Sequence, residues 1–236
     1  MTAALQVDSL YAGYGKATVI RDLSLSVPEG ATVALLGPNG AGKTSTLGAV
    51  TGTVKVSSGS VRLGRHQLTG LSAYQRASLG LTLIPEGRGI FPGLSVAENL
   101  TLAVDSARGV DPSWRTRQLA RVGELFPALG GRSKQRAGTM SGGEQQMLAV
   151  SRAFLANPRV LLMDEISAGL APLIVELLYR AVEHLKDDGV TIVLVEQYLT
   201  YALKLADICY VLGRGTVRFV GEPAELQAGG EGVGYL

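Results

Sequence analysis

The chain has 236 residues, 46% of them hydrophobic and 18% charged; such a chain can bury the core of one or two domains and is too apolar for a disordered polyelectrolyte. The 22 basic and 20 acidic side chains give a net charge of +2, which argues against a nucleic-acid partner bound through a strongly basic surface. The single cysteine, Cys209, excludes an internal disulfide framework and a multi-cysteine zinc site. The start of the chain lacks the pattern of a signal peptide, and every apolar run is far shorter than the roughly 20 residues of a membrane-spanning helix. These features predict a soluble protein of a reducing compartment.

The first third of the chain has the pattern of short strands separated by turns that contain Gly or Pro. It predicts strands at residues 5–10, 18–27 and 31–36, a helix at 44–51, and further strands at 60–63 and 81–84. The run at 31–36 is rich in Val and Leu, which is typical of a strand buried on both faces of a parallel sheet.

From about residue 95 to 157 the pattern becomes helical, and it begins with Ser95 and Glu98 at the spacing of a capping box. From residue 159 it alternates again, predicting a strand at 159–163, a helix at 172–187 and a strand at 191–195. A helical stretch between two α/β stretches predicts a helical subdomain inserted into one α/β body.

Residues 37–44 read GPNGAGKT and match the phosphate-loop pattern G-x-x-x-x-G-K-[ST] between a predicted strand and a predicted helix. Glycines let backbone N–H groups face an anion, and the helix N-terminus adds its dipole. We expect Lys43 to reach the β- and γ-phosphates of a nucleotide and the Thr44 hydroxyl to bind Mg²⁺. The alternative is a glycine-rich turn that matches by accident. The predicted nucleotide-binding residues are Gly37, Pro38, Asn39, Gly40, Ala41, Gly42, Lys43, Thr44 and Ser45.

The strand at 159–163 leads directly into two carboxylates, Asp164 and Glu165. This is the edge of the sheet where α/β proteins place ligands. We expect Asp164 to hold the same Mg²⁺ as Thr44, and Glu165 to act as the general base that polarises water. Without the phosphate loop, the two acids would be read as the start of an ordinary turn.

A third motif, residues 140–145 (MSGGEQ), precedes a predicted helix. Ser141 fits an N-cap, and Gly142 and Gly143 expose backbone N–H groups to an anion. By itself S-G-G is more often a flexible turn, but here it lies 23 residues before Asp164 in a chain that also carries a phosphate loop.

Together, residues 37–44, 140–145 and 160–165 resemble the nucleotide-binding subunit of ABC transporters, and the likeness extends from Tyr14 to about Gly221. It implies an α/β fold with a P-loop ATPase core and parallel sheet, an N-terminal antiparallel β subdomain and an inserted α-helical subdomain. It also implies one domain over 1–236, with the core at about 1–94 and 158–236 and the helical subdomain at about 95–157.

The same resemblance implies how a nucleotide is held. Tyr14 would stack on adenine, and two subunits would sandwich two ATP molecules. Each ATP would lie between one subunit's phosphate loop and the other subunit's signature, here Ser141, Gly142, Gly143 and Glu144. Hydrolysis would then drive membrane partners between inward- and outward-facing states.

Among the positions that depart from the family's usual pattern, Glu86 stands where a glutamine is usual and Gln197 where a histidine is usual. With Glu165, they are the predicted catalytic residues. The sequences at 85–88 (PEGR), 196–197 (EQ) and 169–172 (GLAP) resemble one of the two ATP-binding subunits of branched-chain amino acid transporters. Urea-transporter subunits are similar but tend to keep glutamine where Glu86 stands.

The resemblance implies an ATP- and Mg²⁺-dependent ATPase that energises membrane import of a small solute, with branched-chain amino acids favoured. It implies a peripheral position at the cytoplasmic face of the membrane. The expected partners are transmembrane permease subunits, a second ATPase subunit that is identical or, as we favour, non-identical, and indirectly a solute-binding protein. The alternatives are a urea or other amide importer, a soluble ABC ATPase outside transport, and a regulatory subunit that binds ATP with little turnover.

Overall fold

The computed structural model describes residues 3–107, 109–196 and 199–228, and the chain forms two compact units. The first unit comprises Met1–Leu83, Arg159–Glu165 and Gly189–Leu236, and the second comprises Ile84–Pro158 and Ile166–Asp188. The domain division expected from the sequence stays a prediction. The second unit begins before residue 95 and also includes the segment after residue 165.

Within the residues that the structure describes, the larger sheet has six strands in the order β10-β9-β3-β8-β7-β6. β3 pairs in parallel with β8 and β9, and β7 with β8, whereas β10 is antiparallel to β9. Every residue of β3, β7 and β8 is buried, as expected for apolar strands covered on both faces. The strands are β3 (Thr32–Leu36), β6 (Leu81–Ile84), β7 (Val160–Asp164), β8 (Thr191–Val195), β9 (Ile208–Gly213) and β10 (Thr216–Gly221).

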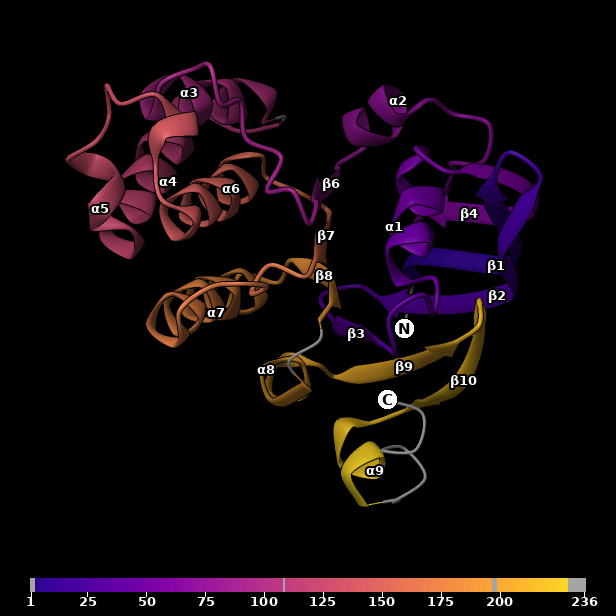
Figure 1. Ribbon diagram of the computed structural model, residues 1–236. Helices are drawn as coiled ribbons and strands as arrows, with labels where there is room; N and C mark the ends of the chain where they lie inside the picture. The colour runs from indigo at the N-terminus through magenta and orange to yellow at the C-terminus, as the bar shows by residue number, and fades with distance from the viewer. Residues whose placement is uncertain (1–2, 108, 197–198, 229–236) are drawn as a thin grey trace. The chain divides into compact units, whose positions relative to one another are not determined.

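The smaller sheet is antiparallel and has the order β2-β1-β4-β5; Figure 1 shows β1, β2 and β4 side by side. Its strands are β1 (Ala3–Tyr14), β2 (Ala17–Pro28), β4 (Lys55–Leu63) and β5 (His66–Gln67). β4 begins earlier than the predicted residue 60, because Lys55, Val56 and Ser58 pair with β1. That segment is mostly polar, so the hydrophobic pattern did not predict a strand there.

In the described part of the first unit the helices are α1 (Lys43–Thr51), α2 (Ala73–Ser78), α8 (Leu199–Leu205) and α9 (Pro223–Ala228). The buried side chain of Arg76 on α2 donates from Nη1 to the carbonyl oxygens of Ala49 at 2.7 Å and Val50 at 2.8 Å. These carbonyls lie in the last turn of α1, where a cation is favourable. Arg76 therefore fixes the C-terminal end of α1, the helix that follows the phosphate loop.

The second unit is helical, and Figure 1 shows α3, α4, α5 and α6 gathered together. α6 contacts α3, α4, α5 and α7, so it is the central helix of this unit. The predicted capping box at Ser95 and Glu98 is confirmed at the start of α3. The elements are α3 (Val96–Ser106), α4 (Pro112–Leu125), α5 (Pro127–Gly130), a 3₁₀ turn η1 (Ala137–Thr139), α6 (Gly142–Leu155) and α7 (Pro172–Asp187).

These sheets and helices confirm the predicted α/β class, and the antiparallel strand β10 adds to the parallel pairs that β3, β7, β8 and β9 form. Among the described residues, none of the helices combines the length and apolarity that crossing a bilayer requires.

Candidate functional site

The loop between β3 and α1 is shaped by glycines in the left-handed region. Gly37 has a φ of 140°, and a Cβ at this position would lie 2.3 Å from the carbonyl oxygen of Leu212 on β9. Gly42, with a φ of 104°, is the N-cap of α1, and no side chain in the described part of the chain caps that helix. The first N–H groups of α1 are thus the kind of donors that phosphate-binding loops offer to an anion.

Lys43 is held within this loop. Its side chain is 5% exposed, and Nζ donates to the carbonyl oxygens of Gly37 at 2.8 Å and Pro38 at 3.2 Å. The same Nζ lies 4.0 Å from Oε1 of Glu165, whose side chain is 12% exposed. The two residues predicted to act on the γ-phosphate are therefore brought together, although they are far apart in sequence.

Tyr14, at the end of β1, meets the first turn of α1. Its hydroxyl oxygen lies 3.5 Å from Oγ of Ser45, and its side chain is 55% exposed. Thr44, beside Ser45, is also exposed. The structure therefore gathers Tyr14, Ser45 and Thr44 around the phosphate loop, with an open aromatic side chain at its margin.

The positions of Asp164 and Glu165 are set by the order of the parallel strands. β8 separates β7 from β3, so the carboxyl ends of these strands lie along one edge, where α/β sheets bind ligands. Asp164 is buried, and the backbone N–H of Glu165 donates to the carbonyl oxygen of Val195 at 2.9 Å. Glu165 has a φ of 49°, a conformation that costs about 1–3 kcal/mol in a non-glycine residue and that recurs at functional sites.

The donors predicted for Mg²⁺ are one carboxylate, Asp164, and one hydroxyl, Thr44. Among the described residues no group of three or more His, Cys, Asp or Glu side chains could form a metal cage. Mg²⁺ is usually held by one or two carboxylates together with substrate phosphates rather than by such a cage, so the donor set fits Mg²⁺ that arrives with a nucleotide.

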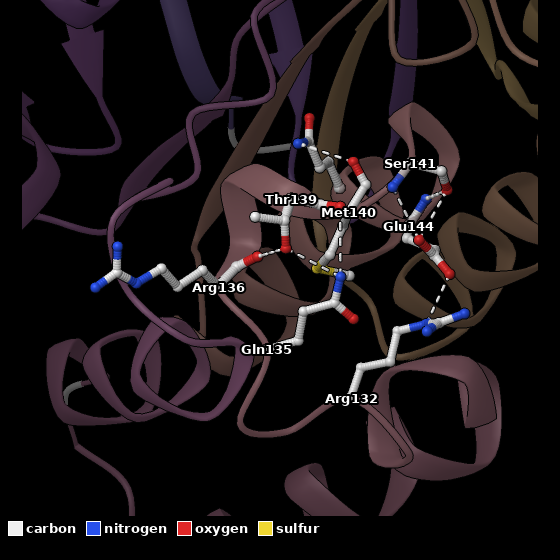
Figure 2. A network of polar contacts seen from close by, with 8 residues as sticks. Arg132, Gln135, Arg136, Thr139, Met140, Ser141 and Glu144 are labelled. Carbon is white, nitrogen blue, oxygen red and sulfur yellow. Dashed lines mark hydrogen bonds and ion pairs between the residues drawn. The ribbon is translucent and has the colours of Figure 1, made fainter.

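The signature residues stand at the start of α6, shown in Figure 2. Oγ of Ser141 accepts from the N–H of Glu144 at 3.4 Å, and Oε2 of Glu144 accepts from the N–H of Ser141 at 2.9 Å. The predicted N-cap at Ser141 is confirmed, and it belongs to a full capping box. Hydrogen bonds from Ser141, aided by Arg132 with Nε 2.7 Å from the carboxylate, lower the pKa of Glu144 below its ordinary value.

Glu144 thus has a clear role within the turn, since it fixes the backbone of Ser141 and the direction of α6. Gly142 and Gly143, next to it, are partly exposed. The signature is therefore a rigid helix start with backbone accessible at its glycines.

The predicted site residues divide between the two units. Tyr14, residues 37–45, Asp164 and Glu165 belong to the first unit, whereas Glu86 and residues 141–144 belong to the second. Glu86 is exposed in the loop after β6, and its catalytic role stays a prediction. Gln197 lies outside the described residues, and the preceding Glu196 is buried.

Two residues that lie in the quoted sequences 85–88 and 140–145, but to which the sequence assigned no role, are engaged at the signature. Arg88 donates to the side chain of Gln145, and Gln145 in turn contacts the turn before Ser141. The sequence carries no signal for this pairing, because the two side chains come from separate segments.

The comparisons with known proteins agree with this geometry. The model of the ABC transporter family matches residues 20–168. The chain is 43% identical to the "High-affinity branched-chain amino acid transport ATP-binding protein BraG" of Pseudomonas aeruginosa, covering 90% of each chain. It is 36% identical to the "Probable branched-chain amino acid transport ATP-binding protein LivF" of Archaeoglobus fulgidus, over 94% of this chain and 93% of that one.

A solved structure described as the ATP binding subunit of an ABC transporter superposes with a TM-score of 0.85 at 27% identity, covering 97% of this chain and 94% of that chain. The α/β architecture of the ATP-binding cassette is therefore shared over almost the whole length. On both its sequence and its fold, the chain belongs to the ABC transporter family.

Proposed function

We propose that this chain binds and hydrolyses Mg-ATP to energise the import of a small solute, with branched-chain amino acids as the solute class. The observation that carries the proposal is the placement of Lys43 Nζ 4.0 Å from Glu165 within a glycine-shaped loop at the edge of a parallel sheet. A cation that neutralises the phosphates and a carboxylate that accepts a proton from water both accelerate phosphoryl transfer to water.

In this proposal the backbone N–H groups of residues 37–45 hold the phosphates, Lys43 neutralises the β- and γ-oxygens, and Tyr14 stacks on adenine. Thr44 and Asp164 hold Mg²⁺, which when bound offsets charge on the phosphate oxygens. Glu165 accepts a proton from the attacking water. The water oxygen bonds to the γ-phosphorus, the bond to the β–γ bridging oxygen breaks, and ADP and phosphate leave.

In this proposal the second unit acts when the chain dimerises with another ATPase subunit. The accessible backbone at Gly142 and Gly143 begins a helix, and such a helix start favours an anion. We assign Ser141–Glu144 to the ATP held by another ATPase subunit, and Glu86 and Gln197 to the γ-phosphate end of this chain's own site. Permease subunits at the cytoplasmic face of the membrane, and a solute-binding protein outside it, are the remaining partners.

The solute class rests on two supports. BraG and LivF are both named as branched-chain amino acid transport proteins. The sequences PEGR, EQ and GLAP at 85–88, 196–197 and 169–172 favour the same class over urea carriers, which tend to keep glutamine at position 86.

The test is purification of the tagged chain from native membranes, identification of the permease that accompanies it, and uptake assays in vesicles. Leucine uptake that depends on ATP and is lost with Glu165→Gln supports the proposal. Uptake of urea but not leucine would show that the proposed solute class is wrong and leave the proposed ATPase activity standing. Absence of any permease would overturn the transport role.

A further inference from the structure

The loop after β6 is tied to the signature helix by an arginine. Arg88 closes a turn through its N–H, which donates to the carbonyl oxygen of Pro85 at 2.8 Å, and its φ is 68°. From this backbone position its Nη1 donates to Oε1 of Gln145 on α6. Arg88 and Gln145 belong to the same unit.

Gln145 holds the segment that leads into the signature. Its Nε2 is within hydrogen-bond distance of the carbonyl oxygens of Ala137 at 3.1 Å, Met140 at 3.2 Å and Gly138 at 3.4 Å. Because a guanidinium can only donate, Arg88 forces the amide oxygen of Gln145 toward itself and turns the amide nitrogen toward those carbonyls. Arg88 therefore sets the orientation on which the turn before Ser141 depends.

The same guanidinium lies against the signature itself. A Cβ at Gly142 would be 2.9 Å from Nη2 of Arg88, so the absence of a side chain at 142 lets the arginine pass close to the first turn of α6. Arg88 thus contacts α6 at Gly142 and at Gln145, on either side of Glu144.

The loop that carries Arg88 is itself fixed. Arg152, further along α6, donates to the carbonyl oxygen of Gly89 and lies 4.6 Å from the ring centre of Phe91. The buried Asn99 binds both backbone groups of Phe91, accepting from its N–H at 2.9 Å and donating to its carbonyl oxygen at 3.0 Å. The arginine is therefore presented from a rigid support.

We infer that Arg88 is a positioning residue for ATP hydrolysis, which acts through Gln145 to hold Ser141–Gly143 in the conformation that receives the partner subunit's ATP. The inference rests on the proposed function, in which the signature completes another subunit's site. It assigns Arg88 no contact with the nucleotide of its own phosphate loop.

The test compares Arg88→Gly, Gln145→Leu and the double variant in the assembled transporter. Glycine adopts a φ of 68° freely, so Arg88→Gly removes the side chain without straining the loop. Because a misplacement of about 1 Å can lower a rate about 100-fold, we expect kcat to fall about 10- to 100-fold in each single variant and no further in the double. ATP affinity of the isolated chain should change less than about twofold, since the phosphate loop and Tyr14 belong to the other unit.

Arg214→Gly is the matched control, because Arg214 is also an arginine with positive φ, 53°, and its side chain is exposed. Its kcat should equal that of the wild type. Arg88→Lys, which retains a donor, should recover part of the lost kcat. If Gln145→Leu does not fold, Arg88→Gly and Arg88→Lys test the inference by themselves. In both variants kcat should fall, by less in Arg88→Lys, while ATP affinity stays as in the wild type.

Wild-type kcat in Arg88→Gly, in a protein that Lys43→Ala inactivates, would overturn the inference and leave the proposed function standing. Additive losses in the double variant would also overturn it, because Arg88 would then act independently of Gln145. The proposed function would instead be refuted if the wild-type protein had no ATPase activity, or had activity that Lys43→Ala leaves unchanged.

Discussion

At the scale of single residues, the Lys43 ammonium is surrounded by oxygen atoms from the Gly37 and Pro38 carbonyls and the Glu165 carboxylate. An ammonium has three donors and no acceptor. Phosphate oxygens of a nucleotide can replace the loop carbonyls as acceptors for these three donors. Their negative charge also neutralises the ammonium. The local geometry therefore suits exchange between a closed loop and a bound nucleotide.

We predict that Lys43→Ala lowers the affinity for ATP about 10- to 100-fold, because a hydrogen bond to a charged group contributes about 1.5–3 kcal/mol. Calorimetric titration measures it. Lys55→Ala, at an exposed position of β4, is the control and should bind ATP as the wild type does. Equal affinities in both variants would remove Lys43 from the site.

We predict that Glu165→Gln retains ATP binding but loses hydrolysis, since glutamine keeps the shape of the side chain and does not accept a proton. General-base catalysis contributes about 100- to 10,000-fold. Steady-state phosphate release measures the loss, and gel filtration with Mg-ATP should show a dimer larger than the nucleotide-free form. A wild-type rate would exclude Glu165 as the base.

At the scale of elements, α1 is held at both ends. Gly37 and Gly42 shape its start, and Arg76 binds two carbonyl oxygens in its last turn and that of Leu71 through Nε at 3.0 Å. The helix that carries Lys43 is thus fixed by a residue outside the nucleotide site.

We predict that Arg76→Met lowers the free energy of unfolding by about 2–4 kcal/mol, because each buried carbonyl left without a partner costs about 1–3 kcal/mol. Arg76→Lys should lose less, since it keeps a donor. Urea denaturation measures both variants against Arg65→Met, which changes an exposed arginine. A similar small effect of Arg76→Met and Arg65→Met would contradict this role.

The capping box of α6 makes stability depend on pH. The pKa of Glu144 is lowered from its ordinary value of 4.5 by hydrogen bonds from Ser141 and by Arg132. A carboxyl group whose pKa is lowered by folding stabilises the native state above its unfolded pKa, and that stabilisation is lost as the pH falls through the folded value.

We therefore expect wild type to be more stable than Glu144→Gln at about pH 7 and the difference to shrink toward about pH 3. Glu98→Gln, in the capping box of α3, where the pKa is lowered by the same kind of hydrogen bonds from Ser95, should show the same trend. It should leave kcat unchanged, whereas Glu144→Gln should lower it. A difference that stays constant with pH would be evidence against the Glu144 carboxylate as its source.

At the scale of the whole molecule, we predict a subunit that hydrolyses ATP slowly alone and works beside a non-identical ATPase subunit. Glu86 adds a negative charge where the family usually has glutamine, and Gln197 does not acquire the positive charge of a histidine. Both changes reduce the positive charge that offsets the phosphates in the transition state. A partner with the usual residues could form the faster site.

The measurement is steady-state ATPase of the isolated chain against the assembled transporter, with Gln197→His and Glu86→Gln made singly and together. The two changes should raise the rate of the isolated chain. If that chain is already as fast as the assembly and neither change alters it, the asymmetric arrangement is wrong.

The sequence by itself determined the features that depend on neighbouring residues. The start of α1 after a glycine-rich turn, the Ser141 cap and the buried strands β3, β7 and β8 were all predicted to within about a residue. Glycines, caps and apolar runs dictate backbone conformation within a few residues. The early start of β4 was missed, because polar residues 55–58 join the sheet only by pairing with β1.

Only the tertiary structure decided which distant groups meet. The approach of Lys43 to Glu165 depends on strand order in the sheet, and that of Tyr14 to Ser45 on where β1 ends against α1. The Arg88–Gln145 bond joins residues 57 positions apart through packing of a loop on α6. Such contacts follow from strand pairing and from which surfaces bury each other, and no pattern of adjacent residues records either.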